Sequence, residues 1–150
     1  MSQSRREVVA PVTPLLHGGA YVAAMPTDQR RDRGTLGERI ATAHLERRGY
    51  AIVDRNFRTR RGELDIVAAD DRALVFCEVK TRVIGGRAGP ATPLEAIGPD
   101  KQRRLRALAR EWLATPNERP HRPEIRFDAI GITITASGDL VALQHLEAAF

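Results

Sequence analysis

The sequence predicts an α/β protein in which helices flank a central mixed sheet. The first observation is the order of the expected elements, which is helix, three strands, helix and two strands. The second is the long stretch between the third and fourth strands. It is sufficient for a helical crossover, which would set the fourth strand parallel to a neighbour in the same sheet. The length of 150 residues suits one domain with a core of ordinary size.

Both expected helices start at a capping signal. Thr35 and Glu38 have the spacing of a capping box, apolar residues then recur at helical intervals, and Gly49 suits the C-terminal stop. A second capping box at 92–95 opens the later helical region. After an interruption by glycine and proline, Asp100 can cap a longer helix that reaches residue 114.

The strands are expected from apolar runs bounded by turn residues. Two of them flank the polar turn 69–72 and would form a hairpin, and a glycine-rich loop at 85–90 separates this hairpin from the second helix. The other strands are expected at 51–57, 125–135 and 140–146.

The first 33 residues have no apolar periodicity and are expected to lack regular structure, which leaves 34–150 as the folded domain. Within this extension, Met25 is an alternative translation start, and a faint export-signal pattern is interrupted by prolines and glycines. No apolar run approaches the roughly 20 residues of a membrane span. The single cysteine, Cys77, is expected to be buried in a reducing compartment, which favours a cytoplasmic protein.

Three charged residues stand inside the apolar strands of the hairpin: Asp65, Glu78 and Lys80. A charge in such a strand is costly unless it is paired or binds a metal. If Asp70 and Asp71 form the turn centre, residue 65 faces residue 76. Asp65 and Glu78 are then diagonal neighbours on one sheet face, and Lys80 follows at the two-residue period. The alternative is that Asp65 is a sheet-edge charge that suppresses aggregation.

The dispersed histidines do not have the spacing of zinc ligands, so any metal should be bound by oxygen atoms. Oxygen ligands predict Mg²⁺ or Mn²⁺ as the metal. The backbone carbonyl of Val79 could complete the ligand set, and Lys80 could orient water and stabilise an oxyanion. Glu38 could join the site from the first helix, but its role in the capping box explains this residue equally well. Glu63 would face Glu78 directly and is either a third acid of the site or solvated at the strand end. Asp128, also within a strand, is expected to form a salt bridge.

A net charge of +5 and a pI near 10.3 favour an anionic partner. The natural contacts to a phosphate backbone are the arginine-rich turn, the end of the third strand and the basic second helix. The candidate residues are Arg58, Arg60, Arg61, Arg82, Lys101 and Arg104. The alternative for the helix is an ordinary solvated face.

One combination of motifs resembles a known family. Its residues are Gly37-Glu38, Gly49-Tyr50, Asn56, 62–65, 76–82, Lys101 and 126–128. The pattern is similar to the YraN-like family of uncharacterised bacterial proteins from about Gly34 to the C-terminus. That family itself resembles restriction-endonuclease-like nucleases, particularly archaeal Holliday junction resolvases.

The resemblance implies an αβββαβ core and an aspartate followed by a Glu-x-Lys triplet, here Asp65, Glu78 and Lys80. It also implies Glu38 as an auxiliary metal ligand. Leu64 departs from the pattern, since many such nucleases have proline there. The implied function is a Mg²⁺- or Mn²⁺-dependent endonuclease acting on DNA, including branched or damaged DNA, and a homodimer is a compatible assembly. The rival is a non-catalytic nucleic-acid-binding or adaptor protein on the same fold.

Overall fold

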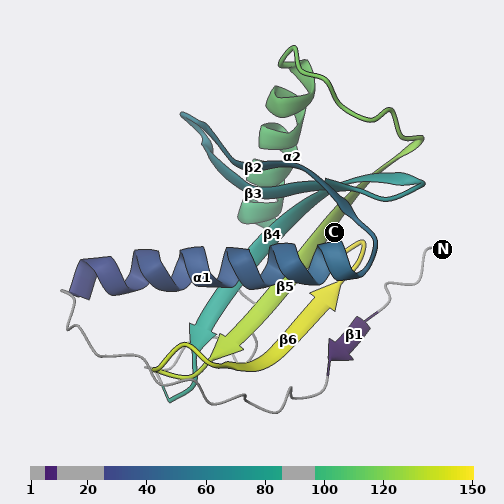
Figure 1. Ribbon diagram of the computed structural model, residues 1–150. Helices are drawn as coiled ribbons and strands as arrows, with labels where there is room; N and C mark the ends of the chain where they lie inside the picture. Colours follow the sequence, from purple (N-terminus) through teal and green to yellow (C-terminus); the bar gives the residue numbers. More distant parts are fainter. Residues whose placement is uncertain (1–5, 10–25, 86–96) are drawn as a thin grey trace.

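The computed structural model describes residues 6–9, 26–85 and 97–150 (Figure 1). The described elements are β1(Arg6–Val9), α1(Pro26–Arg47), β2(Ala51–Thr59), β3(Gly62–Ala69), β4(Ala73–Val83), α2(Pro99–Ala114), β5(Glu124–Ile134) and β6(Leu140–Leu146). No helix within these ranges is long and apolar enough to cross a membrane. The expected capping box at 92–95 and most of the expected loop at 85–90 lie outside the described residues.

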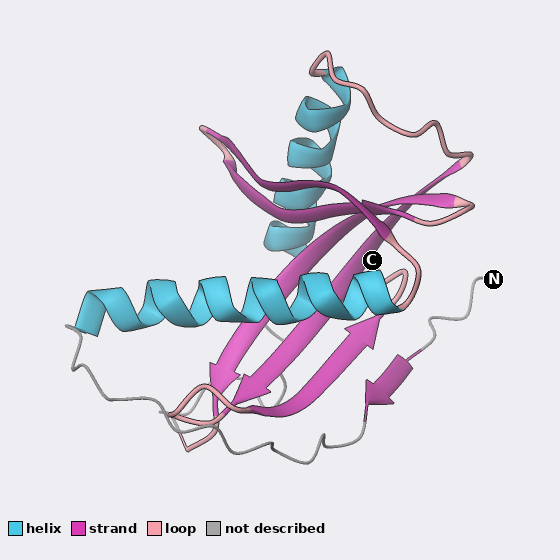
Figure 2. Cartoon of the chain, viewed as in Figure 1, coloured by secondary structure: helices cyan, strands magenta, loops and turns pink. Residues whose placement is uncertain are grey.

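The strands of the described ranges belong to one twisted sheet with the order β1-β6-β5-β4-β3-β2 (Figure 2). β4 and β5 are parallel, and every other neighbouring pair is antiparallel. The connection from β4 to β5 passes through α2, as a crossover between parallel strands requires. The expected mixed α/β architecture is therefore confirmed, and β6 has the bounds that the sequence predicted.

Each helix covers one face of the sheet and encloses its own core (Figure 1). Ala41 and Leu45 of α1 pack on residues such as Ile66 and Val75. On the other face, residues of α2 pack on the alternate positions of the same strands; Leu105, Leu108 and Trp112 contact a cluster that includes Val67 and Phe76. The alternation of β3 and β4 thus sends successive side chains into two different cores.

The first helix is longer than expected and starts at Pro26, not at Thr35. Thr35 lies inside it, where its hydroxyl donates to the carbonyl of Arg31 at 3.0 Å, so the expected capping box does not form. The added turns consist mostly of arginine and other polar residues, which an apolar periodicity cannot reveal although several are adequate helix formers. Together with β1, they correct the expectation that the chain lacks regular structure up to residue 33.

The hairpin between β3 and β4 is shifted by two residues from the expected register. Val67 pairs with Phe76, because the turn is centred one position later, at 71–72. Asp70 fixes this turn: its Oδ1 accepts the N–H groups of Arg72 at 2.8 Å and Ala73 at 2.7 Å. A shift of two residues keeps each side chain on its own face, whereas a shift of one would exchange the faces.

Candidate functional site

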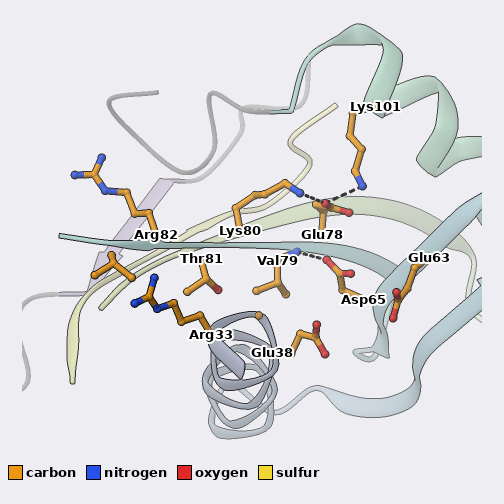
Figure 3. A pocket seen from close by; sticks show the side chains of 12 residues that line it. Arg33, Glu38, Glu63, Asp65, Glu78, Val79, Lys80, Thr81, Arg82 and Lys101 are labelled. Carbon is orange, nitrogen blue, oxygen red and sulfur yellow. Dashed lines mark hydrogen bonds and ion pairs between the residues drawn. The ribbon is translucent and has the colours of Figure 1, made fainter. Parts of the chain in front are cut away.

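A pocket opens where β3 and β4 pass between the two helices (Figure 3). Carboxylates gather at one end of it and basic groups at the other and along its rim. Its lining includes the predicted residues Glu38, Glu63, Asp65, Glu78, Val79, Lys80, Arg82 and Lys101, together with Arg33 and Thr81. The structure therefore brings the predicted catalytic and metal-binding residues to one place.

Glu78 is the most deeply buried of these carboxylates, with only 2 % of its surface exposed. Its Oε1 accepts two ammonium groups, from Lys80 at 2.6 Å and from Lys101 of α2 at 3.0 Å. Its Oε2 is buried and has no hydrogen-bond partner. Because an unpaired buried carboxylate oxygen is costly, this atom marks a place where a cation would be stabilised.

Asp65 reaches the same pocket from β3. Its Oδ2 accepts the N–H of Val79 at 2.8 Å. The pKa of Asp65 is raised to about 7, because burial and then the nearby charge of Glu78 outweigh the opposing effects of the Val79 N–H and Lys80. A divalent cation is complementary to a pocket in which one carboxylate lies close enough to a second to disfavour its charge.

The two carboxylates do not share one sheet face, and that part of the prediction is wrong. Figure 3 shows Glu78 and Lys80 on one side of β4, and Asp65 on the other side together with the side chain of Val79. Leu64 packs in the core beneath α2 and Ile66 in the core beneath α1, so the alternation of β3 breaks at Asp65. The regular pairing of β3 with β4 also ends at Ile66. This break lets Asp65 approach β4 in the plane of the sheet.

Glu38 and Glu63 lie together on the side of α1 and are joined by Asn56. With its amide oriented to satisfy both neighbours, Asn56 donates to Glu38 Oε2 at 2.9 Å and to Glu63 Oε1 at 2.8 Å. Burial raises the pKa of Glu38. Glu63 is paired across the strands with Arg58, with Arg58 Nε 3.1 Å from its Oε1. Its predicted position opposite Glu78 is wrong because the register differs.

Asn56 is a site residue that the chemical reasoning from sequence did not assign. Its backbone has φ 56°, in the left-handed region that asparagine tolerates better than most residues. An asparagine inside a run of otherwise strand-forming residues was the available signal. Close packing also positions Glu38: a Cβ on the adjacent Gly37 would collide with the hydroxyl of Thr81, so α1 lies directly against β4.

The donor set suits a hard divalent cation, although it is not fully assembled. All candidate side-chain ligands are carboxylate oxygens, which Mg²⁺ and Mn²⁺ prefer. Across 6–9, 26–85 and 97–150, no three His, Cys, Asp or Glu side chains already converge as a metal-binding group. The unpaired Glu78 Oε2 and the Asp65 carboxylate in the same pocket are the groups that would hold a cation. The backbone N–H of Val79 donates to Asp65. The role of the Val79 carbonyl as a metal ligand stays a prediction.

The basic residues predicted to contact a phosphate backbone divide into two groups. Lys101 and Arg82 line the pocket, while Arg60 and Arg104 are exposed outside it. The hairpin arginines have protein partners as well: Arg58 contacts Glu63, and Arg61 contacts Glu111 at 2.8 Å. Lys101 lies deeper in the pocket than expected, because its ammonium contacts the buried carboxylate of Glu78.

Asp128 forms the predicted salt bridge in a second buried network, beneath the end of α1. Arg126 Nε lies 2.8 Å from its Oδ1, and His145 Nε2 lies 3.0 Å from its Oδ2. The ring of His145 contacts His44 of α1 at 3.1 Å. Burial, and then the neighbouring His145, lower the pKa of His44 to about 4, so this ring is neutral near pH 7. The network connects α1, β5 and β6.

Comparison with known proteins gives a consistent result. The model of the uncharacterised protein family UPF0102 matches residues 37–132. A UPF0102 protein of Frankia alni is 48% identical over 118 residues, which covers 78% of this chain and 92% of the relative. A UPF0102 protein of Geobacter sulfurreducens is 46% identical over 117 residues, covering 78% and 87% respectively. The matched region contains every predicted catalytic and metal-binding residue. The chain therefore belongs to the uncharacterised protein family UPF0102, as its resemblance to the YraN-like proteins predicted.

Proposed function

We propose that this protein is a Mg²⁺- or Mn²⁺-dependent endonuclease that hydrolyses phosphodiester bonds in DNA. The observation that carries the proposal is the buried Glu78 carboxylate, which has an unpaired Oε2 and Asp65 and Lys80 beside it. Such an arrangement is costly for stability alone, and it supplies the oxygen ligands and the positive charge that phosphoryl transfer requires.

In this proposal, Glu78 and Asp65 hold the cation. A divalent ion bound there would polarise the phosphate and lower the pKa of a bound water. Glu78 positions Lys80 by the 2.6 Å contact, so the ammonium can donate to an oxygen on which negative charge develops. The Val79 N–H fixes the orientation of Asp65. Glu38, which is free of any capping role, is placed by Asn56 as an auxiliary acid.

The substrate strand would follow the positive groups that surround the pocket. Arg33 and Arg82 line the end away from the carboxylates, as Figure 3 shows. Arg60 and Arg104 extend the positive surface beyond the pocket. Contacts of this kind position a phosphate backbone without reading its sequence. They suit DNA recognised by shape, and branched or damaged DNA is the proposed class.

The test is cleavage of a panel of duplexes, nicked duplexes, flaps and four-way junctions in the presence of Mg²⁺ or Mn²⁺. The wild type should cleave at least one of them, and Asp65→Asn and Glu78→Gln should each abolish cleavage. Glu118→Gln serves as the matched control, since Glu118 is exposed on the loop after α2 and outside the pocket. Cleavage that persists in both site variants would refute the assignment.

The second candidate is a non-catalytic nucleic-acid-binding or adaptor protein. It is favoured by one feature, since the ammonium groups of two lysines contact Glu78 and can balance its charge. Calorimetry separates the candidates: a nuclease should bind Mn²⁺ in a manner that Asp65→Ala removes. Salt-dependent DNA binding with no Mn²⁺ binding supports the adaptor.

A further inference from the structure

We propose that Lys101 is a built-in counter-ion of Glu78 that competes with a divalent cation for this carboxylate, and so sets the metal affinity of the pocket. The inference deepens the proposed function and rests on it for the nature of the cation. The family resemblance placed Lys101 in a motif without a role, and the charge distribution suggested only a phosphate contact. Its position at the buried carboxylate gives it a different role.

The composition of the chain singles out this residue. Lys80 and Lys101 are the two lysines among 24 basic residues, and every other basic residue is arginine. Both lysines contact Oε1 of Glu78. The buried partner of Asp128, in contrast, is Arg126. A chain that uses arginine at all its other basic positions therefore has ammonium groups at this carboxylate.

The geometry explains why an ammonium suits this position. A guanidinium pairs with a carboxylate through two parallel N–H donors and tends to occupy both oxygens. An ammonium is a point donor, and the two lysines leave Glu78 Oε2 without a partner. Lysine at position 101 thus neutralises Glu78 while keeping one oxygen available to a cation.

Lys101 is also the more easily displaced of the partners of Glu78 by virtue of its position. It lies in the first turn of α2, across the pocket from β4, whereas Lys80 is on the same strand as Glu78 (Figure 3). Its contact with Glu78 is also the longer of the two, at 3.0 Å against 2.6 Å for Lys80, and its partly exposed ammonium can be solvated once it leaves the carboxylate. A cation at Glu78 would then replace the charge that Lys101 withdraws.

The experiment measures Mn²⁺ affinity by calorimetry or electron paramagnetic resonance for the wild type, Lys101→Met and Lys101→Arg. Lys101→Met should bind Mn²⁺ about tenfold more tightly or better, since a close ionic partner shifts such equilibria by one to three powers of ten. Lys101→Arg should bind it more weakly than the wild type, because its two donors would also occupy Oε2. Arg103→Met is the matched control, since Arg103 is exposed on the same turn of α2 and pairs with Asp100.

A second readout is independent of catalysis. The rise in Tm caused by saturating Mn²⁺ should be larger for Lys101→Met than for the wild type, because tighter binding to the folded state stabilises it more. Equal affinities across the series, or weaker binding by Lys101→Met, overturn the proposal. Absence of Mn²⁺ binding in all the proteins overturns both this inference and the nuclease. Mn²⁺ binding without DNA cleavage refutes the nuclease alone, and the affinity series still decides the role of Lys101.

Discussion

Two buried carboxylates in this fold, Asp128 and Glu78, differ in how their oxygens are paired. Both oxygens of Asp128 are satisfied: Oδ1 accepts from Arg126 and the Ala148 N–H, and Oδ2 accepts from Arg126 and His145. Glu78 has both its partners on Oε1 and none on Oε2. A charge buried for stability has its hydrogen-bonding capacity filled, whereas an incompletely paired one is the better candidate for binding a ligand.

The largest expected effect separates these two carboxylates by stability. Asp128→Asn should lower the free energy of unfolding by about 3–5 kcal/mol, because it removes the buried charge that pairs with Arg126 and His145 and leaves the half-buried guanidinium only the longer ionic contact with Asp70. Glu78→Gln should change the stability by about 1 kcal/mol or less, because both of its lysines can turn to solvent. Urea denaturation of the two amide variants checks this contrast. Equal losses of stability would show that Glu78 is a structural charge like Asp128.

A smaller effect is expected where α1 meets the site. Gly37→Ala should destabilise the fold by about 1–3 kcal/mol, because the added methyl group overlaps the Thr81 hydroxyl and overpacks this contact. The same change moves Glu38 away from the pocket. The double variant Gly37→Ala with Thr81→Ala should recover most of the lost stability in thermal unfolding. No recovery would mean that α1 is held against β4 by other contacts.

The smallest effect is expected for the pH dependence of wild-type stability, because the contributions of the two regions have opposite signs and largely cancel. The folded-state pKa of His44 is lowered to about 4, so its contribution to stability is lost as the pH falls from about 6.5 towards 4. The folded-state pKa of Asp65 is raised to about 7, so the folded protein binds the proton more tightly, and stability falls as the pH rises from about 4 to 7.

These slopes oppose each other in the wild type, and single variants should reveal each one. Asp65→Asn should leave stability rising with pH between 4 and 6.5, with a limiting slope of about 1.4 kcal/mol per pH unit. His44→Gln should leave stability falling with pH over the same range. Urea denaturation at several pH values measures both slopes. Parallel curves for the two variants would contradict the assignment of these groups.

The sequence predicted the central features because they depend on local patterns. The crossover through α2 follows from the length of the connection, and the grouping of Asp65, Glu78 and Lys80 follows from the hairpin. The grouping was predicted because the hairpin brings the end of β3 beside β4 in either register, although the predicted common sheet face was wrong. The break in alternation at Asp65 could not be predicted, since it depends on how Leu64 and Ile66 pack in separate cores.

Other features required the three-dimensional structure for the same physical reason. The contact of Lys101 with Glu78 joins α2 to β4, and only the packing of the crossover helix decides which of its residues meets the strand. The early turns of α1 are polar and carry no apolar pattern. The sequence shows that lysine is scarce, but only the structure shows that both lysines contact the same carboxylate.

We propose that Glu78, unlike Asp128, is buried in order to bind a cation. Titration of Mn²⁺ into the wild type and Glu78→Gln by calorimetry tests it most directly, with circular dichroism to establish that the variant is folded. The wild type should have a Mn²⁺ site, and the folded variant should lack it. Equal Mn²⁺ binding by both proteins, or none by the wild type, would contradict it.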